Sequence, residues 1–309
     1  MIKDTLKKNL EKYLQFRTGL GYTDFYNVKH RLELFTDFCI KNYGEEEYLT
    51  KEMIDSWFAS IQFKKSKTQV NTVGFMRGFT RFLNSMGIPA YIPDKDYSIR
   101  SPKFIPLIYT DDELAKLFEA IDSLGPTKFC PNRDVIMPVL FRMIYCCGLR
   151  PGEPLRLKVE DVNLKTGDIY IKKSKNDKDR HIIMSEELKD LCCKYNALAG
   201  ERTYFFQWHD GNPIKVTWIN TQLKEAVRKT GISFRQLPRT YDFRHNFATR
   251  NMMRWMDQKK DIFALLPVLS EYMGHKTINH TLYYVHLMPE RLLKSAGINW
   301  EKLNTLYKD

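Results

Sequence analysis

Four short segments in the second half of the chain carry side chains suited to chemistry on a phosphate group. In residues 147–157, Arg150 closely follows Gly148, which ends a predicted helix. An arginine on such a turn is expected to be exposed and can offer its planar guanidinium to a phosphate through two hydrogen bonds. The second segment is a lysine-rich turn between two predicted strands, which includes Lys175. Its lysines could reach into a groove of a bound polyanion.

The third and fourth segments add histidine and tyrosine. Residues 241–249 open an amphipathic helix with Tyr241 and Arg244 in its first turns. Farther along, His275 follows Gly274, and the pair Tyr283-Tyr284 follows within ten residues. Each of these residues alone is explained by helix capping, a solvated turn or core packing, because short motifs carry little information. Their combination in this order is what indicates chemistry.

The same residues argue against a metal or nucleotide cofactor. His275, His280 and His286 are separated by five and six positions, which does not place them on one helical face. The six cysteines have no zinc-binding spacing, and the chain lacks a Gly-x-x-x-x-Gly-Lys-Ser/Thr phosphate loop. We therefore expect no metal and no cofactor.

The elements that position these residues begin with a predicted helical domain over residues 1–88. Apolar residues recur there at steps of three and four in the stretches 6–16, 25–39, 53–58 and 70–83. Thr50 is the expected N-cap of the third helix, and the fourth stops at Gly87. The aromatic stripes of these helices are most simply core residues.

A linker and a second domain follow. Residues 89–109 hold four prolines without periodicity, which is typical of an extended linker. A capping box from Thr110 to Glu113 opens the second domain, over residues 110–288, and a long helix is expected at 132–147.

The rest of the second domain mixes short strands with helices. The alternation in 168–172 and 180–184 predicts a β-hairpin, a further strand is expected at 203–206, and helices dominate afterwards. The fold class is thus mainly α with a small β-sheet (α+β). Residues 289–309 form a C-terminal tail.

Composition favours a polyanion as partner. The 309 residues carry 49 Lys and Arg against 37 Asp and Glu, a net charge of +12. Residues 1–100 hold 16 basic and 12 acidic side chains and the remainder 33 and 25, so the excess is not a basic tail. No apolar run is long enough to span a membrane, and the charged N-terminus is unlike a signal peptide. We expect a cytoplasmic protein with reduced thiols and no membrane partner.

The ordered motifs resemble those of the tyrosine recombinases, the phage integrase family, over the whole chain. Arg150 with Glu153 downstream is similar to the family's first arginine box, and residues 175–180 (Lys-Asn-Asp-Lys-Asp-Arg) to its Lys-Gly-Asn-Lys-Glu-Arg turn. Arg244-His245 followed by Phe-Ala-Thr resembles the second arginine box. Gly274-His275 and the Tyr-x-His ending at Tyr284 match the family's last two motifs.

The resemblance implies a site-specific DNA recombinase that breaks and rejoins strands by phosphoryl transfer. Tyr284 would attack a scissile phosphate, leaving a 3′-phosphotyrosyl link and a free 5′-hydroxyl, and the reverse step would join a new strand without ATP. Arg150 and Arg244 would bind the non-bridging oxygens, and His275 would add a hydrogen bond. Lys175 would protonate the departing 5′-oxygen.

Two positions depart from the family pattern or leave it open. Tyr241 stands where the family usually has histidine. Its phenol can hydrogen-bond a phosphate oxygen or orient the nucleophile, but it is a poor base at neutral pH. In the doublet Tyr283-Tyr284, register favours Tyr284 as the nucleophile, with Tyr283 as a packing or DNA-facing neighbour.

The resemblance also implies partners. The helical domain over residues 1–88 would grip double-stranded DNA at a recombination site, opposite the catalytic domain over 110–288. The tail at 289–309 would dock on a neighbouring subunit of a DNA-bound tetramer, although packing on its own domain is nearly as well supported by sequence. No room is left for an arm-binding domain, as in a small Xer-like or mobile-element integrase. A directionality factor is a further candidate partner.

Two other functions stay open at this point. A type IB topoisomerase shares the catalytic residue set, but the integrase-like first domain and the Gly274-His275 pair argue against it. A DNA-binding protein that has lost catalysis would explain Tyr241, but every other active-site position is filled. Strand exchange, relaxed circles or bare binding would separate the three functions.

Overall fold

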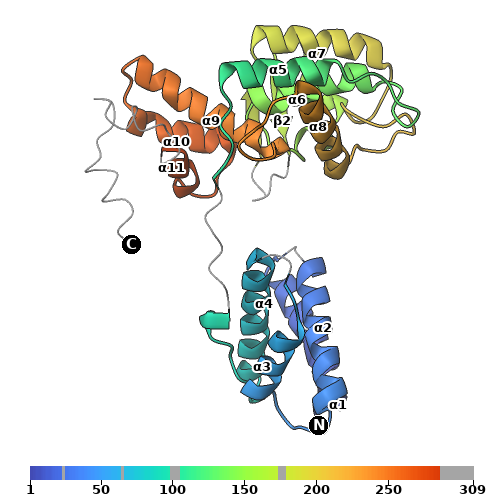
Figure 1. The fold of residues 1–309 in the computed structure, drawn as a ribbon, viewed down its shortest axis with the longest axis vertical. Helices are drawn as coiled ribbons and strands as arrows, with labels where there is room; N and C mark the ends of the chain where they lie inside the picture. Colours follow the sequence, from blue (N-terminus) through green and yellow to red (C-terminus); the bar gives the residue numbers. More distant parts are fainter. Residues whose placement is uncertain (23–24, 64–65, 98–104, 173–178, 286–309) are drawn as a thin grey trace. The chain divides into compact units, whose positions relative to one another are not determined.

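The computed structural model describes residues 1–22, 25–63, 66–97, 105–172 and 179–285 (Figure 1). The chain divides into two compact units, Met1–Phe104 and Ile105–Asp309. The first is helical, and the second combines helices with one three-stranded sheet in the part that is described. This confirms the predicted class, mainly α with a small β-sheet.

The first unit is built from the four helices that the apolar periodicity predicts. They are α1 (Ile2–Gly19), α2 (Phe25–Tyr43), α3 (Lys51–Ser60) and α4 (Ser66–Ser85). Thr50 caps α3 as expected, since its hydroxyl accepts a hydrogen bond from the backbone N–H of Met53. The aromatic stripes face the core, where Phe35 and Trp57 are both buried and meet edge to face with ring centroids 5.1 Å apart.

The segment expected to be a linker begins with residues that pack on the first unit. The backbone N–H of Tyr91 donates to the carbonyl of Leu49 at 2.9 Å. A short 3₁₀ turn, η1 (Lys95–Tyr97), stacks the ring of Tyr97 on Phe58 with centroids 5.0 Å apart. Tyr91 and Tyr97, expected in the linker, thus make contacts within the first unit.

The second unit opens with the predicted capping box. Thr110 and Glu113 exchange both side chain-to-backbone hydrogen bonds at the start of α5 (Asp111–Asp122). Its other helices are α6 (Arg133–Cys146), α7 (Glu186–Ala199), α8 (Val216–Thr230), α9 (Thr240–Asp257), α10 (Ile262–Met273) and α11 (Asn279–Val285), with 3₁₀ turns η2 (Pro154–Arg156) and η3 (Val159–Asp161).

The sheet contains the predicted hairpin and one strand that was not predicted. Strand β2 (Asp168–Ile171) pairs antiparallel with β3 (Arg180–Ile183), and Ile171 lies opposite Arg180. The short β1 (Val162–Asn163) adds to the other edge of β2. The turn that carries Lys175 lies outside the described residues.

The strand expected at residues 203–206 is wrong. Tyr204 forms only an isolated antiparallel bridge with Lys158, and the backbone N–H of Phe205 donates to Leu157 at 2.7 Å. Phe205 and Phe206 are both fully buried, so their aromatic character reflects a core-filling loop and not the alternation of a strand.

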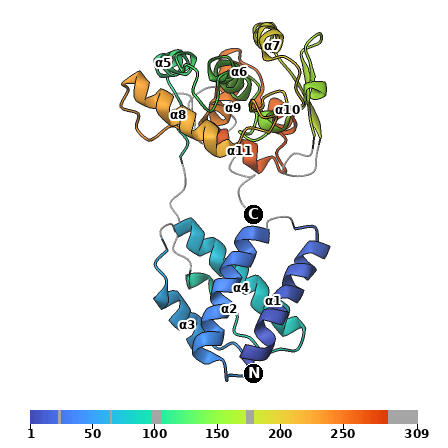
Figure 2. The same ribbon diagram turned by 90° about the vertical axis from the view of Figure 1, so that its right-hand side faces the viewer.

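Helix α9 packs against two hydrophobic clusters of the core. This packing holds the helix, and the polar side chains on it, in place. At its start, Phe243 is fully buried and packs on rings that include Phe118 and Phe141. Farther along, Met252 belongs to a second cluster shared with α10 and α11. The three helices lie together in both views (Figure 2). Among the described residues, no helix is long and apolar enough to cross a membrane.

Candidate active site

Five of the six predicted site residues belong to the described chain, and the structure gathers them around the end of α10. The sixth, Lys175, falls outside the described residues, as do His286 and the tail over 289–309. The five are contributed by the turn after α6, by α9, by the turn after α10 and by α11; they are Arg150, Tyr241, Arg244, His275 and Tyr284.

Gly148 makes the turn that presents Arg150. Its φ is +57°, and a Cβ there would lie 2.3 Å from a ring carbon of Phe247 on α9, so only glycine fits. The Arg150 guanidinium donates to the carbonyl of Gly274 at 2.5 Å and to Glu153 at 2.8 Å. The side chain is only 15% exposed, so the expectation of an exposed arginine is wrong, because these two acceptors draw it inward.

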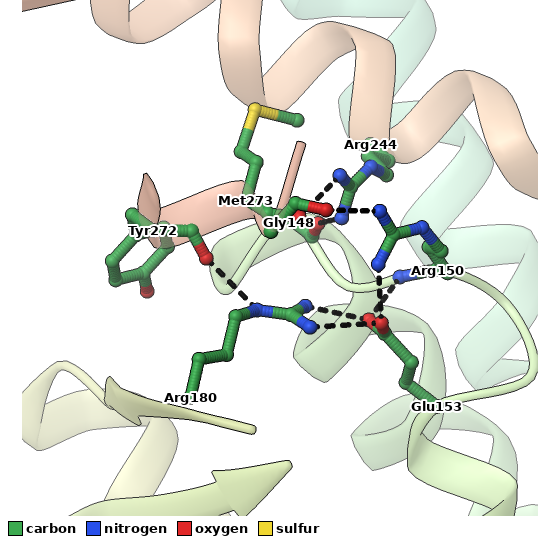
Figure 3. Close-up of polar contacts among 8 residues, drawn as sticks. Gly148, Arg150, Glu153, Arg180, Arg244, Tyr272 and Met273 are labelled. Carbon is green, nitrogen blue, oxygen red and sulfur yellow. Dashed lines mark hydrogen bonds and ion pairs between the residues drawn. The ribbon is translucent and has the colours of Figure 1, made fainter. Parts of the chain in front are cut away.

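Glu153 holds a second buried arginine that the sequence analysis did not single out (Figure 3). Arg180, the first residue of β3, makes two hydrogen bonds to the Glu153 carboxylate, at 2.9 and 2.7 Å. Burial alone would raise the pKa of Glu153, but the hydrogen bonds and charge of Arg180 lower that pKa to about 2. The carboxylate is therefore ionised and bridges Arg180 to Arg150.

Arg244 is fully buried, on the second turn of α9. Its guanidinium donates to the carbonyls of Gly148 and Met273, both at 2.6 Å (Figure 3). Two of its five N–H donors are used in this way. Desolvation by burial lowers the pKa of Arg244, but an arginine keeps its charge at neutral pH.

Three successive backbone carbonyls at the end of α10 organise the arginines. Tyr272 accepts from Arg180 at 2.9 Å, Met273 from Arg244, and Gly274 from Arg150. The last carbonyls of a helix lack helical partners and carry the negative end of its dipole, which favours cations there. Three guanidiniums thus meet at one helix end, and among the described residues only two of them, those of Arg150 and Arg180, bind a carboxylate, which leaves an excess of positive charge suited to a phosphate.

The phenol of Tyr284 lies between two histidines beside this cationic cluster. Its hydroxyl is 3.2 Å from Nδ1 of His245, and its ring stacks on that of His275 with centroids 6.1 Å apart and planes at 20°. Tyr284 is 3% exposed. Tyr283 is less deeply buried, and its ring centroid lies 6.5 Å from that of His245. Tyr284 is therefore the more deeply buried of the two tyrosines.

Burial and the neighbouring arginines set the protonation states of this group. Desolvation raises the pKa of Tyr284 to about 12, although the charge of Arg244 opposes the shift. Desolvation, helped by the charge of Arg244, lowers the pKa of His245 to about 4 and that of His275 to about 3. In the protein without DNA, the tyrosine is a neutral phenol and both imidazoles are uncharged at neutral pH.

Tyr241 lies at the rim of the site. It is 40% exposed and stands one helical turn before His245, with ring centroids 5.0 Å apart. Its phenol can therefore contact a ligand and the imidazole on the same helical face. This placement suits a hydrogen-bonding role.

Sequence reasoning missed Glu153, Arg180 and His245 as members of the site. Glu153 and His245 were visible as neighbours of the two arginines, three residues after Arg150 and one after Arg244. Arg180 offered no local signal, because its partner lies 27 residues away in the sequence. The one signal in the sequence was that Arg180 is a charged residue at an inward-facing position of a predicted strand, where a buried partner is expected.

The described residues contain no group of three or more His, Cys, Asp or Glu side chains arranged to hold a metal ion. All six cysteines are free thiols.

Comparison with known proteins identifies the family of this chain. The model of the phage integrase family matches residues 108–291. The putative integrase/recombinase y4rE of Sinorhizobium fredii is 32% identical over 91% of both chains, and tyrosine recombinase XerC of Thermodesulfovibrio yellowstonii is 27% identical over 93% of both.

Solved structures share the fold. The XerH site-specific recombinase in a post-cleavage complex with palindromic difH has a TM-score of 0.65 at 20% identity, covering 89% of this chain and 79% of that chain. A lambda integrase fragment (75–356), solved as a dimer on a COC′ core site, has a TM-score of 0.66 at 15% identity, covering 90% and 94%. Because the family model matches residues 108–291 and a relative is 32% identical over 91% of the chain, the chain belongs to the phage integrase family and is a tyrosine recombinase.

Proposed function

We propose that this site-specific recombinase cleaves DNA with the phenol oxygen of Tyr284. The observation that carries the proposal is the placement of the buried Tyr284 hydroxyl 3.2 Å from His245, beside the guanidinium cluster. In the reaction, the phenol oxygen forms a bond to phosphorus and the bond from phosphorus to the 5′-oxygen breaks. The products are a 3′-phosphotyrosyl link and a 5′-hydroxyl.

The phenol proton leaves toward His245. A neutral imidazole can accept it, and a bound phosphodiester would raise the pKa of His245 because it offsets the positive charge of Arg244. The weak nucleophile is thus activated by its position and by a base that strengthens when DNA is present.

Charge that develops on the phosphate is met by the arginines. Arg150 and Arg244 would exchange some of their carbonyl contacts for non-bridging oxygens, and His275 would donate one more hydrogen bond. In many enzymes, hydrogen-bond donors fixed in a site shielded from water make the largest single contribution to stabilising the transition state. Lys175 would protonate the departing 5′-oxygen, and Tyr241 would support the phosphate from the rim.

We extend the proposal to the assembly on DNA. The first helical unit would bind the recombination site together with the catalytic unit, and a tetramer would exchange strands, with residues 289–309 docking between subunits. A cytoplasmic enzyme of a mobile element, with or without a directionality factor, fits these features. The net charge of +12 supports a DNA substrate.

The test is capture of the covalent intermediate. The purified protein is incubated with a nicked duplex that carries its recombination site, found by selection from random duplexes, and complexes are resolved on a denaturing gel. We expect a shifted band that Tyr284→Phe abolishes and Tyr283→Phe retains. Loss of the band in Tyr283→Phe alone would move the nucleophile by one residue, and tight binding without any band would contradict cleavage.

A further inference from the structure

A short hydrogen bond connects His275 to the helix that carries Tyr284. Nδ1 of His275 lies 2.7 Å from the hydroxyl oxygen of Thr281, which is fully buried. Thr281 belongs to α11, three residues before Tyr284. The bond therefore ties the turn after α10 to the nucleophile's helix.

The hydroxyl proton of Thr281 is available to the histidine. Other threonines in helices of this protein donate to the carbonyl four residues earlier: Thr72 at 2.8 Å, Thr80 at 3.0 Å and Thr221 at 3.1 Å. Thr281 makes no such bond within the described chain, and its hydroxyl has His275 as partner. A buried hydroxyl without another acceptor is expected to donate to the ring nitrogen.

We propose that Thr281 is a positioning residue that holds His275 as the tautomer with its proton on Nε2. The proposal rests on the phosphate-binding role given above to His275. When Nδ1 accepts from Thr281, the single proton of the neutral ring must lie on Nε2, which makes Nε2 a hydrogen-bond donor. The opposite tautomer would turn a lone pair toward the phosphate oxygens.

The tautomer of His275 decides whether its ring can donate a hydrogen bond to a phosphate. Burial and the charges of Arg244, Arg150 and Arg180 keep the pKa of His275 low, so the ring is neutral and has only one N–H to offer. Nε2 has no hydrogen-bond partner in the described part of the chain. The ring of His275 also stacks on that of Tyr284, which helps to set its orientation. The hydrogen bond from Thr281 adds the position of the ring proton.

The experiment compares Thr281→Val with Thr281→Ser. Valine keeps the buried volume and removes the hydroxyl, whereas serine keeps the hydroxyl. Long-range ¹H–¹⁵N spectra of the imidazole report which nitrogen is protonated, and single-turnover cleavage of the nicked duplex reports catalysis. In Thr281→Val we expect loss of the pure Nε2–H signal and cleavage slower by about 10- to 100-fold, with unchanged DNA affinity. Thr281→Ser should restore both.

Thr249→Val is the matched control. Thr249 is also a fully buried helical threonine, but its hydroxyl has no hydrogen-bond partner among the described residues. This variant should keep the tautomer and the cleavage rate, which separates loss of a bond from loss of a buried hydroxyl.

Two results would overturn the proposal: an unchanged His275 tautomer in Thr281→Val, or a changed tautomer with a wild-type cleavage rate. The spectrum decides the tautomer without any catalysis. A wild-type protein that formed no covalent complex would therefore contradict the proposed function separately.

Discussion

Arg180 and Glu153 form a buried, two-point ion pair that joins the β-hairpin to the loop of the first arginine. The two nitrogens of the Arg180 fork meet the two carboxylate oxygens at 2.9 and 2.7 Å, and both side chains are almost completely buried. The same carboxylate binds Arg150. One acidic residue thus sets the positions of two cations in the site.

Breaking this pair should destabilise the protein strongly. Arg180→Met would leave the Glu153 carboxylate buried without its main partner, which costs about 3–5 kcal/mol of unfolding free energy. Urea denaturation of the purified protein, followed by circular dichroism, measures this change.

Asp122→Asn is the control for that measurement. Asp122 also receives a two-point contact, from Arg142, but the side chain of Asp122 is 41% exposed. Solvent screening limits such a pair to about 1 kcal/mol or less. Equal losses in Arg180→Met and Asp122→Asn would contradict the importance of burial.

Gly274→Ala should disturb the cation cluster directly. Gly274 has a φ of +62°, and a Cβ there would lie 3.1 Å from the Arg180 guanidinium, which cannot retreat because Glu153 and Tyr272 hold it. We expect a loss of unfolding free energy from both the backbone and the crowding, together with slower cleavage. Thermal and urea unfolding and the single-turnover rate measure these effects.

Gly231→Ala isolates the backbone contribution. Gly231 ends α8 with a φ of +66°, and nothing lies within 4 Å of its Cβ position. Alanine in the left-handed region costs roughly 1–2 kcal/mol there. If Gly274→Ala proved no more harmful than Gly231→Ala, contact with Arg180 would not restrict position 274.

The elements of the fold were predictable because their signals are local. The capping box at Thr110 and the helical apolar stripes depend on residues three or four positions apart, and the β2–β3 hairpin on simple alternation. The sequence also predicted the turn at Gly148, since a glycine at a helix end commonly adopts positive φ. The failed strand at 203–206 shows the limit, because buried aromatic residues look alike in strands and in core loops.

The interior of the site was less predictable because its contacts are long-range. The acceptors of Arg150 and Arg244 include carbonyls of residues 148, 273 and 274, and a backbone carbonyl carries no mark in the sequence. The contact between His245 and Tyr284 spans 39 residues. The order of the motifs indicates the candidate residues, and only the packing of α9 against α10 and α11 reveals their partners.

Arg150→Lys should separate charge from geometry in catalysis. Lysine keeps the positive charge but cannot reach Gly274 and Glu153 with a planar fork or bind a phosphate at two points. We expect single-turnover cleavage to fall by about 10²- to 10³-fold, as for loss of one fixed donor to developing charge. The dissociation constant for the duplex should change far less. A near wild-type cleavage rate would show that a point charge suffices at position 150.

Stability should fall in acid because His245 is buried in its neutral form. Its pKa is lowered by burial to about 4 in the folded protein, against 6.5 as the ordinary value. The unfolded chain therefore takes up this proton first, so the stabilisation present above pH 6.5 is lost as the pH falls toward 4. The slope from one such group is about 1.4 kcal/mol per pH unit. Urea unfolding at pH 7.5, 6.5, 5.5 and 4.8 should show this loss.

His245→Asn should flatten that profile between pH 6.5 and 4.8. Asparagine does not titrate, so the variant should lose less stability per pH unit than the wild type, by about the slope of one group. Glu153 acts in a separate window, because its pKa of about 2 in the folded protein makes its stabilisation disappear only as the pH falls below about 4.5. Identical profiles for wild type and His245→Asn above pH 4.8 would mean that folding does not lower the pKa of His245, which would contradict the burial of a neutral imidazole at this position.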